Sequence, residues 1–238
     1  ATHFPDPSIH RRNTGYAIDL LRERLDTSLG QHFDITPLLC GSEGTLAFTT
    51  EIEVALDPLP PEFGAMVITH YHTLEACLSD VATVMEHELY TCEMMDKVIL
   101  DCTKGNKLYA ETRSFVENDP EALLMLEVRA HSEEALEEKT SALLHHIEKH
   151  SESYAAPILK GEDINKAHEL RKAGLGLLGN MIGDKKAVAC IEDTAVALND
   201  LKPFIMEFST LMKGYDQKAV YYAHAGAGEL HLRPILNL

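Results

Sequence analysis

The chain has 238 residues, of which 45% are hydrophobic and 25% are charged, so it can bury a core and is not disordered. Its net charge of −17 disfavours binding to nucleic acid or to an anionic membrane surface, because their phosphates would be repelled. No apolar run approaches the roughly 20 residues that a membrane-spanning helix needs. The five cysteines lack metal-finger or thioredoxin spacing, which indicates thiols in a reducing cytoplasm and no iron–sulfur cluster within this chain.

The first quarter of the chain predicts little regular structure. Residues 1–12 are typical of an extended arm, residues 15–28 have helical apolar spacing, and residues 35–39 predict a helical turn. Residues 47–56 alternate apolar and acidic side chains, which predicts a half-buried strand. Three prolines within residues 57–61 then end any strand, so we expect a domain boundary between residues 1–57 and 58–238.

After this boundary, strands and helices alternate. Strands are predicted over residues 65–71, 89–93, 123–128, 155–159, 187–191, 218–223 and 230–235. Helices are predicted over residues 73–87, 94–102, 106–116, 132–150, 161–179 and 200–212, with Thr73 and Ser132 as N-caps. The helical returns and the closing hairpin favour an α+β domain, with a mainly antiparallel sheet and helices packed on one face. A doubly wound parallel sheet is the alternative, but no glycine-rich turn joins a strand to a helix in the dinucleotide-binding manner.

Two glycine-containing stretches are candidates for function. In the first, His224 and His231 flank Gly226 and Gly228 between two apolar runs. Two imidazoles beside a bend can bind a metal or transfer a proton. The second is the polar loop over residues 41–45, whose backbone N–H groups can hold an anion, although it also fits an ordinary turn.

Three segments, taken in order, resemble one enzyme family. They are Arg12-Asn13-Thr14-Gly15-Tyr16, Leu39-Cys40-Gly41-Ser42-Glu43-Gly44-Thr45-Leu46 and His224-Ala225-Gly226-Ala227-Gly228-Glu229-Leu230-His231. With them, the chain resembles the FAD-linked oxidases and dehydrogenases of 2-hydroxy acids, the vanillyl-alcohol-oxidase-like flavoproteins. These include glycolate oxidase FAD subunits and D-lactate dehydrogenases. Residues 169–178 and 189–196 look closest to the subgroup whose longer polypeptides carry iron–sulfur segments.

The resemblance implies the organisation and activity of the chain. Residues 1–57 would be the C-terminal remnant of an FAD-binding domain, and residues 58–238 the substrate-side cap domain. The main flavin-binding segments of the family lie upstream of Ala1, so we expect both ends to be cut and FAD not to be retained by this fragment. The intact enzyme would oxidise a D-2-hydroxy acid such as lactate or glycolate to the 2-keto acid, passing hydride to FAD.

The resemblance also implies roles for individual residues. Arg171 would clamp the substrate carboxylate with its planar fork, although most helix arginines are only solvated charges. His224 or His231 would accept the hydroxyl proton, and both are candidate ligands for a divalent metal such as zinc, with Glu192, Asp193 or Glu229 as a third ligand. The remaining candidates are Arg233 as a second carboxylate contact and, against the flavin, Gly41, Ser42, Glu43, Gly44 and Thr45.

A second hypothesis keeps the cap fold without the activity. The chain would then be a non-enzymatic metal- or ligand-binding domain with a complete site within residues 60–238. For the enzyme, we expect a small 2-hydroxy acid as substrate, a protein or quinone as electron acceptor, and a cytoplasmic location with peripheral membrane association of the full protein. The sequence does not predict the oligomeric state.

Overall fold

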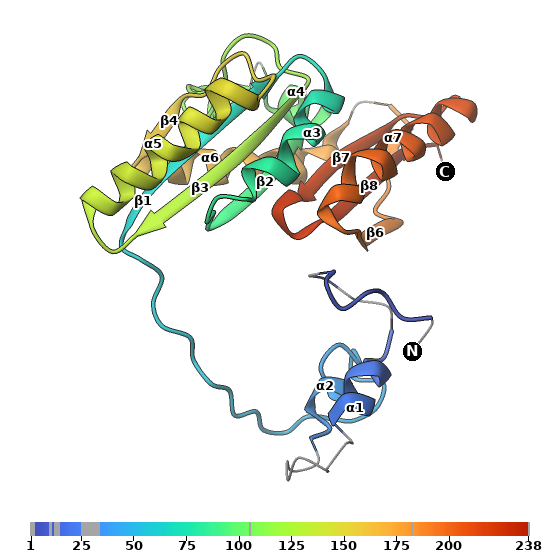
Figure 1. Cartoon of the computed structure of the whole chain (residues 1–238). Helices are drawn as coiled ribbons and strands as arrows, with labels where there is room; N and C mark the ends of the chain where they lie inside the picture. Colours follow the sequence, from blue (N-terminus) through green and yellow to red (C-terminus); the bar gives the residue numbers. More distant parts are fainter. Residues whose placement is uncertain are drawn as a thin grey trace. The chain divides into compact units, whose positions relative to one another are not determined.

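The computed structural model describes residues 3–9, 11, 15–24, 34–104, 106–181 and 183–237 (Figure 1). The sequence segment Arg12-Asn13-Thr14 and the last four residues of the helix predicted over 15–28 lie outside the described residues. The chain divides into two compact units, Ala1–Leu59 and Pro60–Leu238, and the expected domain boundary falls two residues before this division.

The described part of the first unit contains two short helices, α1 (Ile18–Arg24) and α2 (Thr36–Leu39). The strand predicted over residues 47–56 is wrong, because the structure has no regular element there. Phe48 is 92% exposed and Leu56 is 88% exposed. A strand is stable only when its backbone groups pair with a neighbouring strand, and the described part of this unit provides none.

The second unit is built on an eight-stranded sheet in the order β4-β1-β3-β2-β7-β8-β5, with β6 also paired to β8. Every pairing is antiparallel, which confirms the predicted α+β class and excludes the parallel alternative. The strands are β1 (Phe63–Tyr71), β2 (Thr91–Asp96), β3 (Ala122–Ala130), β4 (Ile158–Lys160), β5 (Lys186–Ala187), β6 (Ile191–Ala195), β7 (Ala219–His224) and β8 (Glu229–Leu236).

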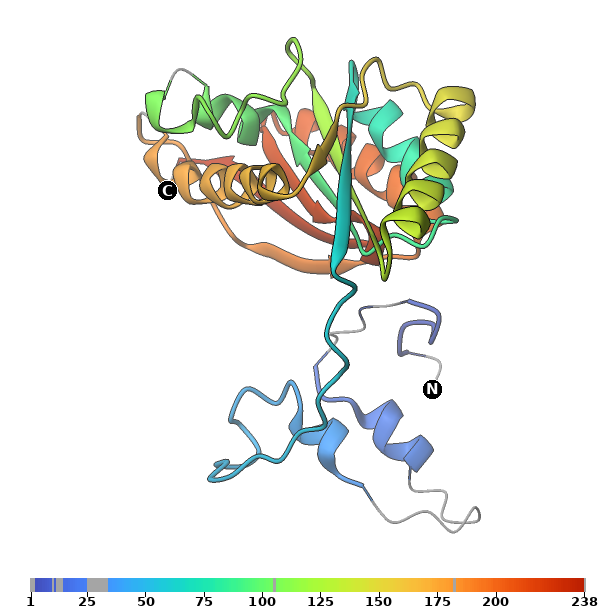
Figure 2. The same ribbon diagram turned by 90° about the vertical axis from the view of Figure 1, so that its left-hand side faces the viewer.

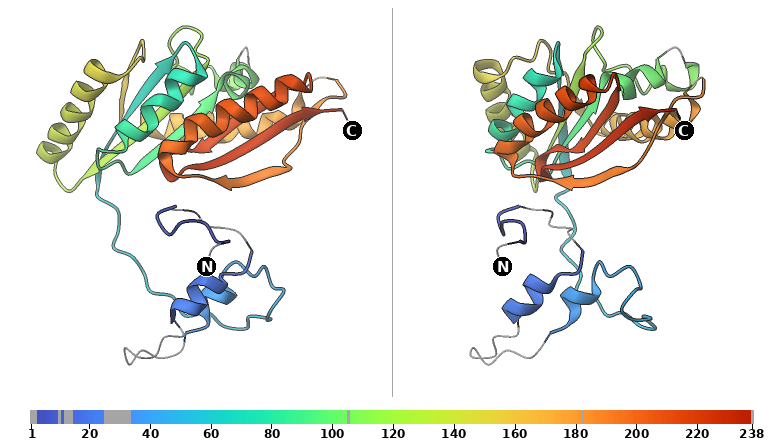
Figure 3. Two further views of the ribbon diagram at one scale, coloured as in Figure 1. Left: turned by 45° about the vertical axis from the view of Figure 1, so that its right-hand side comes forward. Right: turned by 90° about the vertical axis from the view of Figure 1, so that its right-hand side faces the viewer.

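The helices cover both faces of this sheet, so the prediction that they pack on one face needs correction. Figure 2 shows the sheet between two helical layers. One layer contains α3 (Leu74–Val84), α5 (Glu133–His150) and α7 (Leu198–Gly214), which lie side by side in Figure 3. The other contains α4 (Lys97–Thr103) and α6 (Glu162–Leu177). Among the described residues, none of the helices combines the length and apolar character that crossing a membrane requires.

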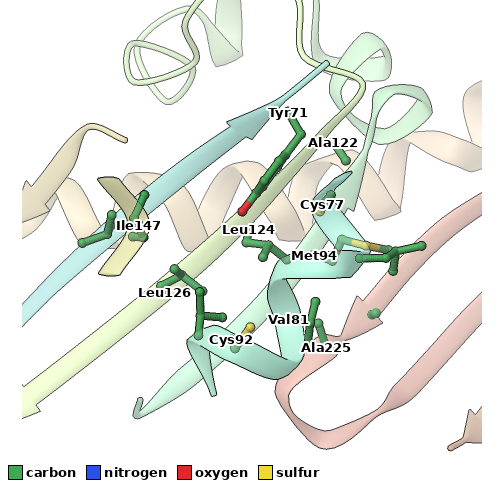
Figure 4. Close-up of a cluster of buried hydrophobic side chains, with 14 of the residues drawn as sticks. Tyr71, Cys77, Val81, Cys92, Met94, Ala122, Leu124, Leu126, Ile147 and Ala225 are labelled. Atoms are coloured by element: carbon green, nitrogen blue, oxygen red, sulfur yellow. The ribbon is translucent and has the colours of Figure 1, made fainter. Parts of the chain in front are cut away.

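The composition of the central strand β3 explains the two layers. Leu124 and Leu126 face the α3 layer, where they pack with Cys77 and Val81 of α3 (Figure 4). Their neighbours Leu123 and Met125 are equally buried on the α4 and α6 side. Because burial of each such side chain contributes about 1.5–3 kcal/mol, the strand is stable only with both faces covered.

Side-chain caps fix where the helices begin. Thr73 and Ser132 accept hydrogen bonds from the backbone N–H groups three residues ahead, as predicted. The buried Asp96 does the same for Ile99 N and also accepts from Tyr221 N. Asp96 therefore ends β2 three residues later than predicted and starts α4 at Lys97.

The helix predicted over residues 106–116 is wrong. The structure has a short 3₁₀ turn, Lys107–Tyr109, followed by further turns. The guanidinium of Arg113 donates to Leu100 O and Thr103 Oγ1, which ties these turns to the end of α4. Phe115 is buried as expected, but Leu108 points outward.

Two strands replace the one predicted over residues 187–191. Both β5 and β6 pair with β8, and the residues that connect β5 to β6 have no regular structure. The predicted hairpin of β7 and β8 is confirmed, with Tyr222 opposite His231 and His224 opposite Glu229. Its turn is a 3₁₀ segment, Ala225–Ala227, followed by Gly228 in the left-handed conformation at φ 66°.

This glycine predicts a measurable cost of substitution. A Cβ on Gly228 would lie 2.1 Å from Val196 O, which is a steric clash. The positive φ alone costs an L-residue about 1–2 kcal/mol. We expect Gly228→Ala to lower the free energy of unfolding by more than that amount in urea denaturation. Gly214→Ala, at the open end of α7, is the matched control and should be neutral or slightly stabilising. Equal effects of the two substitutions would contradict the steric argument.

Candidate functional site

Four of the predicted site residues lie on the same side of the sheet in the second unit. Alternate residues of an antiparallel strand share a face, so His224 of β7 and both His231 and Arg233 of β8 lie on the side of the sheet that α4 and α6 cover. Arg171 comes from α6, which packs on that side. The cross-strand pairing of Tyr222 with His231 sets the hairpin register that aligns them.

Arg171 is held by a carboxylate that the sequence analysis missed. Its Nη2 lies 2.5 Å from Glu93 Oε2 of β2, as a close ion pair in which each side chain is 13% exposed. The guanidinium carbon also lies 4.1 Å from the centre of the Tyr222 ring, at cation–π distance. Arg171 is therefore a positioned, largely buried charge and not the solvated helix arginine of the alternative interpretation.

The same carboxylate holds His224. Glu93 Oε1 lies 3.0 Å from His224 Nδ1, while Arg171 Nη2 lies 3.5 Å from that nitrogen. A carboxylate only accepts hydrogen bonds, so the shorter contact places the imidazole proton on Nδ1. In the neutral form of this tautomer, Nε2 carries the lone pair. Glu93 thus connects a cation and a base through its two oxygens.

His231 belongs to a second acidic group. Its Nδ1 lies 2.9 Å from Asp193 Oδ1 and 3.4 Å from Glu192 Oε2, which are ion-pair distances without good hydrogen-bond geometry. Glu192 also accepts from Arg233 Nε. The register shift of β6 between Ile191 and Thr194 brings the two consecutive acids to His231.

The donor set around His231 fits a divalent cation. Ligand atoms of Glu192, Asp193 and His231 all lie within 4.8 Å of one another, and imidazole with carboxylates suits zinc. The His224 and His231 rings are 5.3 Å apart, but His224 turns its Nδ1 to Glu93. The metal site at both histidines stays a prediction, with Glu192 and Asp193 as the acids beside His231.

The helix α6 is attached to the sheet at a second point, one turn before Arg171. His168 Nε2 lies 3.3 Å from Oε2 of Glu127, a residue of β3 that is almost fully buried. Arg129 Nε donates to the other oxygen of Glu127 at 2.6 Å. Burial raises the pKa of Glu127, but the contacts with His168 and Arg129 outweigh it and hold the pKa below its usual value. The buried carboxylate of Glu127 and the largely buried one of Glu93 thus fix the position of α6 on the sheet.

Glu93 and Tyr222 were missed because their signals are non-local. Glu93 lies between the buried residues Cys92 and Met94 in a strand, a position where an acid needs a partner. The partner, Arg171, is 78 positions away in the sequence, and no spacing rule connects them. The stretch around Tyr222 was singled out only for its histidines.

The predicted flavin-contacting loop lies in the other unit. Gly41 and Gly44 have φ values of 76° and 74°, and no atom of the described residues lies within 4 Å of where their Cβ atoms would be. Thr45 N donates to Ser42 O, and the Thr45 hydroxyl meets that of Tyr16 at 2.7 Å. The loop is therefore a formed turn with open space beside its glycines, where a planar ligand can approach the backbone.

The comparison with known families decides the classification. The sequence profile described as "FAD linked oxidases, C-terminal domain" matches residues 60–238. The chain belongs to this family of FAD-linked oxidases. The resemblance drawn from the sequence is thereby confirmed, and the second unit corresponds to the C-terminal domain of the family.

Curated relatives are similar to this chain at low identity. A D-2-hydroxyglutarate dehydrogenase of Pseudomonas putida is 26% identical over 98% of this chain and 23% of its own length. A D-lactate dehydrogenase of Anaerostipes hadrus is 27% identical over 94% of this chain and 46% of its own length. The glycolate oxidase subunit GlcD of Bacillus subtilis is 25% identical over 84% of this chain and 40% of its own length. The chain thus spans less than half of each relative.

The three-residue contact around Glu93 predicts a specific energetic coupling. Glu93→Ala leaves the buried cation of Arg171 without its partner, which should lower the free energy of unfolding by about 2–4 kcal/mol. In the double variant Glu93→Ala/Arg171→Met the unpaired charge is gone, so a double-mutant cycle by urea denaturation should give a coupling of about 1–3 kcal/mol. Lys172→Met, on the exposed side of α6, is the matched control and should show additivity with Glu93→Ala.

Proposed function

We propose that this chain supplies the substrate side of a flavin-dependent enzyme that oxidises a D-2-hydroxy acid to the 2-keto acid. The observation that carries this proposal is the placement of Arg171 and His224 on the two oxygens of Glu93. It puts a carboxylate-binding cation next to a base, which are the two groups that a 2-hydroxy acid requires. The names of the curated relatives support the same class of reaction.

Arg171 binds the substrate carboxylate in this proposal. Its guanidinium has five N–H donors, of which Glu93 occupies one side. The Nε atom is buried and has no hydrogen-bond partner among the described residues. In a chain with a net charge of −17, an anionic substrate needs a cation that is fixed in place. Tyr222 under the guanidinium keeps its plane oriented.

His224 takes the hydroxyl proton. With the Nδ1 proton held by Glu93, the lone pair of Nε2 accepts the proton as the C–O single bond becomes a carbonyl. The hydrogen on the same carbon leaves with its electron pair, and bound FAD supplies the acceptor for that hydride. Of the described residues, Gly41, Ser42, Glu43, Gly44 and Thr45 are those that fit the flavin, through the open backbone of their loop.

A divalent metal held by His231, Glu192 and Asp193 would lower the pKa of the substrate hydroxyl. His224 would join this metal only in place of its role as the base, because Nε2 has a single lone pair. Arg233 is proposed as the contact for a second carboxylate, which would favour D-2-hydroxyglutarate over D-lactate or glycolate. The Arg233 guanidinium is already paired with Glu192, so a dicarboxylic substrate would share it. The electron acceptor is proposed to be a protein or a quinone.

The test uses the complete polypeptide that contains this chain with its flavin-binding segments. We expect D-2-hydroxy acids to bleach the flavin under anaerobic conditions. Arg171→Lys should raise the substrate concentration at which bleaching is half-maximal roughly 10–100-fold, because a charged hydrogen bond to the substrate is lost. Arg233→Ala should weaken the binding of D-2-hydroxyglutarate and leave the binding of D-lactate unchanged. Lys172→Ala is the control and should behave as wild type.

Bleaching by none of D-2-hydroxyglutarate, D-lactate and glycolate in a flavin-loaded protein would overturn the enzymatic proposal. It would favour the alternative of a metal- or ligand-binding domain with the same fold. Bleaching that Arg171→Lys does not affect would keep the reaction but remove Arg171 from the substrate site.

A further inference from the structure

Three histidines form a cluster on the layer of helices that faces away from the proposed substrate site. His87 follows α3, and His146 and His150 lie on α5. The ring centres of His87 and His146 are 4.9 Å apart, and those of His146 and His150 are 5.0 Å apart. His146 is therefore in contact with both of the others. We name these three residues the histidine cluster.

The local scaffold of the histidine cluster is rigid. His146 and His150 are four residues apart on one helix, so their side chains project from the same face, one turn apart. Asp80 of α3 accepts hydrogen bonds from the hydroxyls of Tyr71 and Ser151, the residue after His150. This bond ties the end of α5 to α3, which leads to His87.

His146 presents a nitrogen with no partner. Its Nε2 is fully buried and makes no hydrogen bond among the described residues. A buried imidazole nitrogen that lacks a donor costs free energy, whereas a neutral imidazole is the form that binds transition metals.

The charge around the histidine cluster favours a cation. Asp80 and Glu86 lie close enough to act electrostatically on His146, in the direction that stabilises positive charge. The net charge of the chain, −17, adds to this attraction. Imidazole donors without cysteine or a converging set of carboxylates suit Zn²⁺, Ni²⁺ or Cu²⁺ more than Mg²⁺ or Ca²⁺.

We propose that the histidine cluster is a binding site for a divalent transition metal, separate from the proposed substrate site. His146 and His150 chelate the ion from successive turns of α5, and His87 supplies a third nitrogen from the end of α3. Their ring nitrogens are not gathered within 4.8 Å of one another as the ligand atoms of Glu192, Asp193 and His231 are, so binding requires the imidazole side chains to rotate toward the ion. The remaining positions are open to water, because His150 is exposed. Such an ion would link α3 to α5 and stabilise the layer.

The proposal is tested with the whole chain, purified without a polyhistidine tag, in a His231→Gln background that removes the other candidate metal group. Zn²⁺ and Ni²⁺ are titrated by calorimetry. We expect one ion per chain, and a loss of affinity of at least about tenfold in His146→Gln/His150→Gln. His87→Gln should cause a smaller loss. His145→Gln is the matched control on the same helix and should bind as the background protein does.

Thermal unfolding with and without Zn²⁺ provides the second readout. The ion should raise the melting temperature of the background protein and of His145→Gln but not of the double variant, because a ligand of the folded state stabilises by mass action. Unchanged affinity in the folded double variant, or no binding by the background protein, would overturn the proposal.

Discussion

The carboxylate of Glu93 is the contact on which the arrangement of the candidate site depends. It binds Arg171 of α6 with one oxygen and His224 of β7 with the other, so a helix and two strands meet at one buried acid. Without this acid, a buried guanidinium would be unpaired and the tautomer of His224 would not be fixed. In the proposed function, the same pairing assigns the two groups different roles, a cation for binding and a base for proton transfer.

The two-sided sheet makes this arrangement possible. Strand β3 is apolar on both faces, so it requires a helix layer on each side. The layer with α6 faces the polar residues of β2, β7 and β8, and Glu127 attaches α6 one turn before Arg171. The opposite layer is free of the proposed chemistry and contains the histidine cluster. One fold thus presents two separate groups of imidazoles.

The sequence predicted features that local physics controls. Apolar periodicity and the caps Thr73 and Ser132 located helices, and the hairpin from residues 218 to 235 was found from its turn and its flanking apolar runs. The predictions from the sequence were wrong where contacts with distant residues determine the local structure. Residues 47–56 alternate like a strand but have no strand to pair with, and residues 106–116 are held as turns by Arg113. In the site, His224, His231 and Arg171 were predicted, whereas Glu93 depends on a contact across 78 positions that no local pattern contains.

The tautomer of His224 tests the central role of Glu93 most directly, and it can be measured on this chain without flavin. Long-range proton–nitrogen correlation spectra of the imidazoles, assigned with His224→Gln, report which ring nitrogen carries the proton. The arrangement predicts that the neutral form of the His224 ring carries its proton on Nδ1, and that Glu93→Ala removes that preference. A proton on Nε2 in the wild-type chain, or a spectrum that Glu93→Ala leaves unchanged, would contradict it.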